Sequence, residues 1–423
     1  MKQYAEKNVS EANFLIFLSW LVYTISYLGK VNYSANITQV IDFYGVTKAQ
    51  AGTVPTFFFF AYGVGQVING LLCKKYNIKW MIFFSLFVSG IVNLVIAVSA
   101  NFSIVKWLWL INGISLSVLW PTIIRQLSEA LPQKDLGTSS VVMGTTVATG
   151  TLIIYGLSSI FAAIHNFKLA FYTAAIAVFI VAVIWIIFYN KVISLAKNER
   201  EQEELVEITK SDKPVEKEQG KWEKKHLYLL ICVLCFFAVG VNLIKDGLTT
   251  WVPSILKEEF FMSDSLSILL TLFLPVLAVF GNVCALKMHI KIPDYINQCA
   301  VAFGIIGVFI GVIIGSLSFK IVLPMLVGLV VVNFFASTLN SLITSIFPMF
   351  MREKVNSGLF AGVLNGFCYL GSTISSYGLG AIADKWGWTA VFITLIGFVV
   401  ISFIVWPVYI CFKRFFYKNI HIS

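Results

Sequence analysis

The stretch YTISYLGKVNYSAN, from Tyr23 to Asn36, carries a lysine, Lys30, inside a run of residues apolar enough to cross a membrane. The stretch VNLIKDGLTTW, from Val241 to Trp251, carries Lys245 in the same kind of surroundings. Charged side chains are rare inside membrane spans, and a lysine at the helix centre costs about 2.5 to 3.5 kcal/mol on insertion scales. Two lysines that share one central cavity would also repel each other, so we expect a bound anion to offset their charge.

The composition of the chain places it among membrane proteins. Of its 423 residues, 58% are hydrophobic and only 12% are charged, and the mean hydropathy is +0.85. Apolar runs of about 20 residues match the thickness of a bilayer's hydrocarbon core. The sequence therefore predicts an all-α polytopic membrane protein with twelve transmembrane helices. We expect them at residues 14–36, 50–73, 79–99, 104–126, 138–163, 168–190, 227–256, 265–286, 294–316, 320–348, 357–382 and 388–412.

The basic residues indicate how these helices are oriented. Of the 31 lysines and arginines, 23 lie in the two terminal tails and the loops that follow even-numbered helices, and six lie on the opposite side. Because cytoplasmic loops carry the excess of positive charge, we expect both termini and the long central loop to be cytoplasmic. The net charge of +10 then reflects topology in a lipid bilayer and gives no reason to expect a nucleic-acid partner. The polar start of the chain lacks the pattern of a cleavable signal peptide, so the first helix is expected to stay.

A charged linker, residues 190–226, divides the chain into an N-terminal half (1–189) and a C-terminal half (227–423) of six helices each. Lys30 and Lys245 then occupy corresponding places, late in the first helix of each half. A parallel repeat with a site between the halves, near the bilayer midplane, is a common design of secondary transporters. The alternative is that the two lysines are unrelated and extend from helix ends toward the membrane surface.

Asp246 is the only acidic residue that lies clearly inside a predicted span. Neighbouring residues of a helix point about 100° apart, so Asp246 need not neutralise Lys245 and could instead face another helix. It is a candidate for a protonatable coupling site or for a group that reduces the positive charge of the cavity. The alternative is a structural partner near the end of its helix.

The lysine pair favours a phosphoryl ligand, because a doubly charged group would pair both ammoniums and a neutral sugar would pair neither. No phosphate-binding loop of a nucleotide-driven pump is present, and the predicted cytoplasmic loops are too short for an ATPase domain. The four histidines and seven cysteines show no metal-ligand spacing, and the Cys232–Cys235 pair lies in a helix without the strand of a redox motif. We therefore expect no metal, no cofactor and no catalytic site.

Five segments, in this order, carry a resemblance to a known family. They are YLGKVN (Tyr27–Asn32), AYG (Ala61–Gly63), NGISLSVLWP (Asn112–Pro121), LIKDGLTTWVPSILKE (Leu243–Glu258) and GFCYLGSTISSYGLGAIADKWGW (Gly366–Trp388). Over nearly its whole length the chain resembles the organophosphate:phosphate antiporters of the major facilitator superfamily, which include the bacterial glycerol-3-phosphate and hexose-phosphate carriers. The resemblance implies the major facilitator fold, with two six-helix halves related by pseudo-two-fold symmetry.

The resemblance also implies a set of substrate-binding residues. Lys30 and Lys245 stand where the family has its two phosphate-gripping basic residues, which are usually arginine in the bacterial members. Tyrosine hydroxyls in the pore lining would donate to phosphate oxygens. The aromatic residues that match this lining are Tyr23, Tyr27, Tyr62, Trp120 and Tyr369. For each of them, ordinary packing or an interfacial belt is the alternative.

Some positions depart from the family pattern. Gln66, a further candidate for substrate contact, stands where the family has a lysine, and Val147 stands where the glycerol-3-phosphate carrier has a pore histidine. Asp246 is unusual at its position, and the loop pattern of the superfamily is degraded to GLLCKKY (Gly70–Tyr76). Fewer cationic groups indicate a less negatively charged, or a different, organic anion.

The sequence thus predicts a secondary transporter, a monomer in a bacterial plasma (inner) membrane, that exchanges an organophosphate for inorganic phosphate by alternating access. A proton- or sodium-coupled symporter of an organic anion, with Asp246 as the proton acceptor, is one alternative. A transporter-like organophosphate sensor is another. The sequence does not name the organic group of the substrate.

Overall fold

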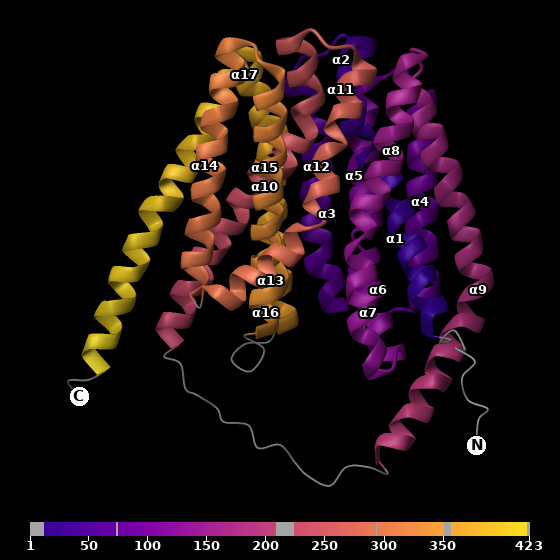
Figure 1. The fold of residues 1–423 in the computed structure, drawn as a ribbon. Helices are drawn as coiled ribbons and strands as arrows, with labels where there is room; N and C mark the ends of the chain where they lie inside the picture. The colour runs from indigo at the N-terminus through magenta and orange to yellow at the C-terminus, as the bar shows by residue number, and fades with distance from the viewer. Residues whose placement is uncertain (1–11, 73–74, 209–223, 293, 351–356, 421–423) are drawn as a thin grey trace, which may run out of the picture.

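The computed structural model describes residues 12–72, 75–208, 224–292, 294–350 and 357–420, and within these ranges all regular structure is helical (Figure 1). The N-terminal tail (residues 1–11), Cys73, Lys74 and residues 209–223 of the predicted linker lie outside the described residues. The first part of the chain forms α1 (Ala12–Ala35), α2 (Ile37–Tyr44), α3 (Lys48–Leu72), α4 (Ile78–Val98), α5 (Phe102–Leu116), α6 (Leu119–Ala130), α7 (Gln133–Gly144), α8 (Thr146–Ala163) and α9 (Lys168–Ile208).

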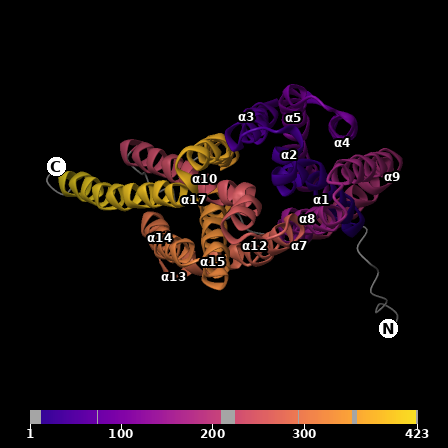
Figure 2. The same cartoon turned by 90° about the horizontal axis from the view of Figure 1, so that it is seen from above.

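The second part forms α10 (Lys224–Phe260), α11 (Asp264–Thr271), α12 (Phe273–Ala278), α13 (Gly281–Lys291), α14 (Tyr295–Phe319), α15 (Val322–Ser341), the π-helical turn η2 (Leu342–Ile346), α16 (Phe347–Phe350) and α17 (Ser357–Ile420). Seen from above, the helices of the two parts form two groups side by side (Figure 2). Two seams join the groups. The Thr56 hydroxyl of α3 donates to the Thr373 carbonyl of α17 at 3.1 Å, and Ser159 of α8 lies 2.9 Å from the Ser265 carbonyl of α11.

The prediction of twelve transmembrane helices is confirmed. Among the described residues, eleven helical segments are long and apolar enough to span a membrane, and the last of them, Gly362–Cys411, contains two spans. The two spans join without a loop because Gly387 alone leaves the helical conformation, with φ 77° and ψ 177°. A positive φ favours glycine, which has no side chain to clash with the backbone.

Several predicted helix ends differ from the structure. The first helix breaks at Asn36 and continues as α2 to Tyr44, and α10 runs to Phe260, beyond the predicted end at 256. Helix α9 runs to Ile208, because the charged residues that begin the linker continue the helix after the apolar span. The lysines at 30 and 245 therefore lie well inside their helical segments and not at helix ends.

Lys48, which begins α3 shortly after α2 ends, ties the two groups together. Helix α2 lies at the upper end of Figure 1. The Lys48 ammonium lies 3.1 Å from Glu258 of α10 and 3.7 Å from Asp384 of α17. The Asp384 carboxylate also accepts hydrogen bonds from the backbone N–H groups of Lys48 and Ala49, at 3.2 and 2.7 Å. A carboxylate from one half therefore caps a helix of the other half.

Lys257, at the end of α10, makes the reciprocal contact. Its ammonium lies 2.6 Å from Asp42 of α2 and 2.9 Å from Asp264 of α11. Each lysine thus contacts at least one carboxylate of the opposite half. We call Lys48, Lys257 and their four carboxylates the upper ion-pair cluster. The cluster holds the two halves together at this end of the bundle.

Candidate functional site

Lys30 of α1 lies among aromatic rings in the middle of the bundle, and only 8% of its surface is exposed. Its ammonium lies 4.0 Å from the ring centre of Tyr62, 4.7 Å from Tyr27 and 5.4 Å from Tyr369. The ring of Phe58 lies 5.8 Å away. Because Tyr369 belongs to α17 and the others to α1 and α3, both halves contribute to this cage. The Tyr27 hydroxyl accepts a hydrogen bond from the ammonium at 3.4 Å.

The charge of Lys30 is not balanced by a nearby carboxylate. Across the described ranges of the chain, no Asp or Glu oxygen lies within 4.0 Å of its ammonium nitrogen. A cation over an aromatic ring gains about 0.5 to 2 kcal/mol, which offsets only part of the cost of burying a lysine. A bound anion would supply the missing compensation.

The five aromatic residues predicted for the site lie in one connected cluster. The hydroxyl oxygens of Tyr23 and Tyr62 are 3.3 Å apart, and the ring of Tyr23 lies 4.8 Å from Trp120 and 5.5 Å from Tyr27. The rings of Tyr62 and Tyr369 are 4.8 Å apart across the two halves. The structure thus brings these residues together around Lys30, with several hydroxyl groups within one small region.

Gln66 lies one turn after Tyr62 on α3 and is buried. Its side-chain oxygen accepts a hydrogen bond from Asn365 of α17. Gln66 therefore joins the two halves next to the aromatic cluster. Asn365 was not predicted, since an asparagine in an apolar span does not reveal its partner.

Lys245 and Asp246 lie near the middle of the span formed by α10. The ammonium of Lys245 is 3.9 Å from the Oδ1 atom of Asp246, and the two side chains are 27% and 19% exposed. Both groups are within electrostatic range of Lys30. The two lysines are therefore unequal, because Lys245 has a carboxylate beside it and Lys30 has aromatic rings.

Asp246 is held by side chains from two helices. Its Oδ2 atom accepts hydrogen bonds from the Ser372 hydroxyl of α17 at 2.5 Å and from Asn242 of α10 at 3.2 Å. Asn340 of α15 donates to the Asn242 oxygen at 2.9 Å. Asn242 could have been found from the sequence, because it precedes Asp246 by one helical turn. Ser372 and Asn340 come from distant parts of the chain, and no local pattern links them to Asp246.

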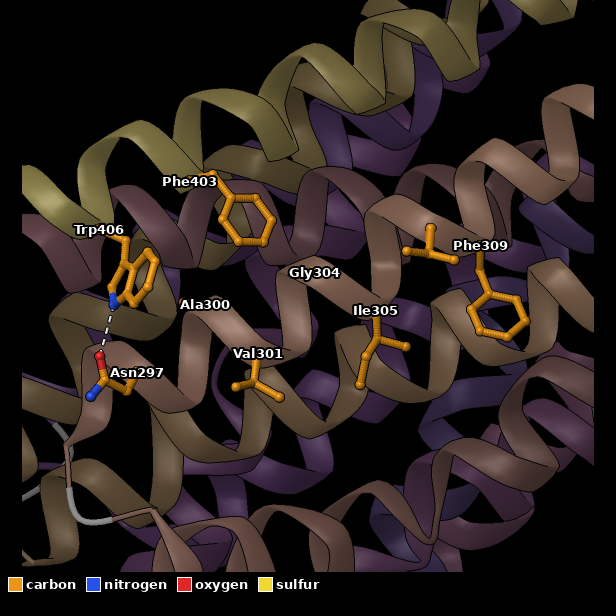
Figure 3. Close-up of a pocket in the computed structure, with 9 residues that line it drawn as sticks. Asn297, Ala300, Val301, Gly304, Ile305, Phe309, Phe403 and Trp406 are labelled. Carbon is orange, nitrogen blue, oxygen red and sulfur yellow. Dashed lines mark hydrogen bonds between the residues drawn. The ribbon is translucent and has the colours of Figure 1, made fainter.

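An apolar pocket lies elsewhere in the C-terminal half. A groove of about 410 Å³ between α14 and the last part of α17 is lined by apolar side chains, among them Val301, Ile305 and Phe403 (Figure 3). Its hydrogen bond joins Trp406 to Asn297 at 2.7 Å. The groove contains none of the predicted site residues, and its lining matches acyl chains better than an anion.

The described part of the chain shows neither a group of metal ligands nor a disulfide. No group of three or more His, Cys, Asp or Glu residues is placed to hold a metal ion there. The six described cysteines are free thiols, Cys232 and Cys235 included.

Comparison with known proteins agrees with this architecture. Residues 19–357 match the family model of the Major Facilitator Superfamily. A "Probable hexose phosphate transport protein" of Chlamydia pneumoniae is 20% identical over 90% of this chain and 87% of that protein. The "Membrane sensor protein UhpC" of Escherichia coli is 21% identical over 23% of each chain.

A crystal structure of a bacterial homologue of the human lysosomal transporter Spinster, described as inward-facing and occupied, has the same fold. Its TM-score is 0.72, with 13% identity over 96% of this chain and 98% of that one. The family match covers most of the sequence and agrees with the eleven apolar helical segments of the described residues, the last of which is long enough for two spans. The chain therefore belongs to the Major Facilitator Superfamily and is an integral membrane transport protein, not an enzyme.

Proposed function

We propose that this protein exchanges an organophosphate for inorganic phosphate, with Lys30 and Lys245 as the groups that bind the phosphoryl moiety. The observation that carries the proposal is the buried Lys30 ammonium, which has aromatic rings around it and, among the described residues, no carboxylate oxygen within 4.0 Å. A phosphoryl group beside Lys30 and Lys245 would pair the charge, and nearby tyrosine hydroxyls would donate to its oxygens. A relative with a hexose phosphate name supports a sugar phosphate as the organic substrate.

Alternating access follows from the position of the site between the halves. A ligand shifts the equilibrium between conformations only by its difference in affinity for them. An anion bound to both lysines would favour the state in which the halves close around it, and the empty site lacks this favourable contribution. Return of the empty carrier is then unfavourable, and the cycle becomes an exchange. We also propose that the ends of α9 and α17 at the lower end of Figure 1 face the cytoplasm, in line with the charge of the loops.

Counterflow tests the proposal. Purified protein in vesicles loaded with unlabelled phosphate should take up labelled external phosphate without an imposed ion gradient. Phosphorylated competitors should inhibit this uptake, and the strongest inhibitor would name the organic substrate. Uptake that occurs only with an inward proton or sodium gradient would contradict the exchange mechanism.

A proton-coupled symporter is the second candidate, because a carboxylate, Asp246, lies beside Lys245. It would show uptake that depends on a pH gradient and loses this dependence in the Asp246→Asn variant. A sensor, which the partial match to a membrane sensor protein supports, would bind phosphorylated compounds without measurable flux. Flux and binding measured on the same preparation separate these cases.

A further inference from the structure

Asp246 has surroundings made of hydrogen-bond donors. Its Oδ2 atom faces the Ser372 hydroxyl at 2.5 Å and the Asn242 amide at 3.2 Å, and its Oδ1 atom faces the Lys245 ammonium at 3.9 Å. The other acceptor of the Ser372 hydroxyl, the Cys368 carbonyl oxygen, is farther away at 3.3 Å. An ionised carboxylate is an acceptor only, and it satisfies all three of these donors.

The orientation of these donors is fixed from a third helix. Asn340 of α15 donates to the Asn242 oxygen at 2.9 Å, so the other end of the Asn242 amide, its NH₂ group, faces Asp246. That NH₂ group also donates to the Ser372 oxygen at 3.2 Å, which leaves the serine hydrogen free to point at the carboxylate. Side chains from α10, α15 and α17 thus surround Asp246 with donors, which an ionised carboxylate satisfies.

Lys30 and Lys245 each contribute one positive charge to the site, and Asp246 contributes one negative charge. The net charge of the site is therefore +1. Resting on the proposed function, we propose that Asp246 makes the site selective for singly charged tetrahedral anions, so that a phosphate ester is bound in its singly charged form. A doubly charged anion would carry an unpaired negative charge into a largely buried site, where such charge is costly. Phosphate monoesters have a second pKa of about 6, so both forms exist near neutral pH.

Anions of fixed charge test this selectivity without titration. Sulfate carries two charges and methyl sulfate one at neutral pH, and both present tetrahedral oxygens. The affinity of detergent-purified protein for each can be obtained from the ligand-dependent rise of its unfolding temperature, which does not require transport. We expect wild type to bind methyl sulfate more tightly. In Asp246→Asn, the ratio of sulfate to methyl sulfate affinity should rise by about tenfold or more, because one opposing charge is removed.

Two further variants test whether the affinity ratio depends on the negative charge at position 246. Asp246→Glu keeps the charge and should keep the preference for methyl sulfate. Asp294→Asn removes a carboxylate that caps the start of α14, outside the site, and should behave as wild type. An unchanged affinity ratio in Asp246→Asn, or a wild type that prefers sulfate, would overturn the assignment.

Phosphate counterflow on the same preparations separates this inference from the proposed function. Exchange without charge selectivity would refute the role of Asp246 and leave the antiporter in place. Charge selectivity without exchange would support the role of Asp246 in an anion site and refute the antiporter.

Discussion

Lys30 differs from most buried lysines in what faces its charge. Its nearest groups are the ring of Tyr62, the ring of Tyr27 and the Tyr27 hydroxyl. Rings attract a cation without neutralising it, so the ammonium stays available to an anion. Lys245 has a carboxylate beside it at 3.9 Å and is more exposed. The two lysines that look equivalent in the sequence are therefore expected to contribute unequally to binding.

Replacing either lysine by alanine should abolish phosphate exchange in vesicles and leave the purified protein folded. The reason is that each substitution removes one of the two positive charges that an anion can pair with. Lys30→Arg should keep part of the activity, since arginine keeps the charge and can also stack on the rings. Lys106→Ala, at a basic residue near the start of α5 and away from the site, is the matched control. Exchange close to the wild-type rate in both alanine variants would refute the binding site.

The sequence reveals some of these residues and hides others for a physical reason. Lys30 and Lys245 stand out because a charge inside an apolar span is costly and must have a purpose. Ser372 and Asn365 do not stand out, because many spans of this chain contain serine or asparagine. Their partners, Asp246 and Gln66, are set by packing between helices that are far apart in the sequence.

At the scale of the helices, the upper ion-pair cluster joins the two halves at one end of the bundle. The Lys48 and Lys257 side chains are each partly exposed, at 20% and 29%. A single exposed ion pair contributes about 0 to 1 kcal/mol of stability, so one such pair alone would hold the halves together only weakly. Two lysines with four carboxylates, together with a helix cap, form a network that must break when this end opens.

Removing both lysines, in the double variant Lys48→Ala with Lys257→Ala, should favour opening at the upper end. Thr56 lies between α3 and α17 within the seam. A cysteine introduced there, as Thr56→Cys, should react several-fold faster with a membrane-impermeant maleimide added from the outside when the two lysines are absent. Lys320→Ala is the matched control, because its ion pair with Glu259 lies within one half. Equal labelling rates in the wild type, the double variant and the Lys320→Ala variant would show that the cluster does not hold this end closed.

The helix boundaries show which structural features can be predicted from local sequence patterns. The apolar runs locate the spans well because length and hydropathy are local properties. The end of the first span is different, since the Asn36 side chain bonds to the Asn32 carbonyl and to Ser158 of α8, and the chain continues as α2. Gly387 likewise redirects the chain within a single residue, where the sequence predicts a loop between two helices.

At the scale of the molecule, glycines in the α3–α17 seam allow the two halves to pack closely together. A Cβ atom added at Gly380 would lie 2.6 Å from the Trp251 ring and 2.8 Å from the Lys48 carbonyl oxygen. Both distances are shorter than real Cβ contacts. Closure of the upper end therefore requires a residue without a side chain at this position.

Gly380→Val should hold the upper end open and lower the rate of phosphate exchange by tenfold or more, because its Cβ atom would meet the Lys48 carbonyl oxygen of the opposite half. The same maleimide reaction at Thr56→Cys should become faster in this variant. Gly378→Val, at a neighbouring glycine whose added Cβ would meet no atom within 4 Å, should leave both rates near wild type. Slow labelling of the Gly380→Val protein would show that the seam tolerates the side chain.

The hydrogen bonds of the Asp384 carboxylate make two backbone amides of α3 sensitive to the separation of the two halves. It is the acceptor for the backbone N–H groups of Lys48 and Ala49, and it belongs to the opposite half. When the halves part at this end, these two amides lose their acceptor and become open to deuterium from the solvent, while amides deeper in α3 keep their bonds within the helix. The uptake of deuterium at the first turn of α3 would thus count the fraction of time that the carrier spends open at this end, without any label attached to it.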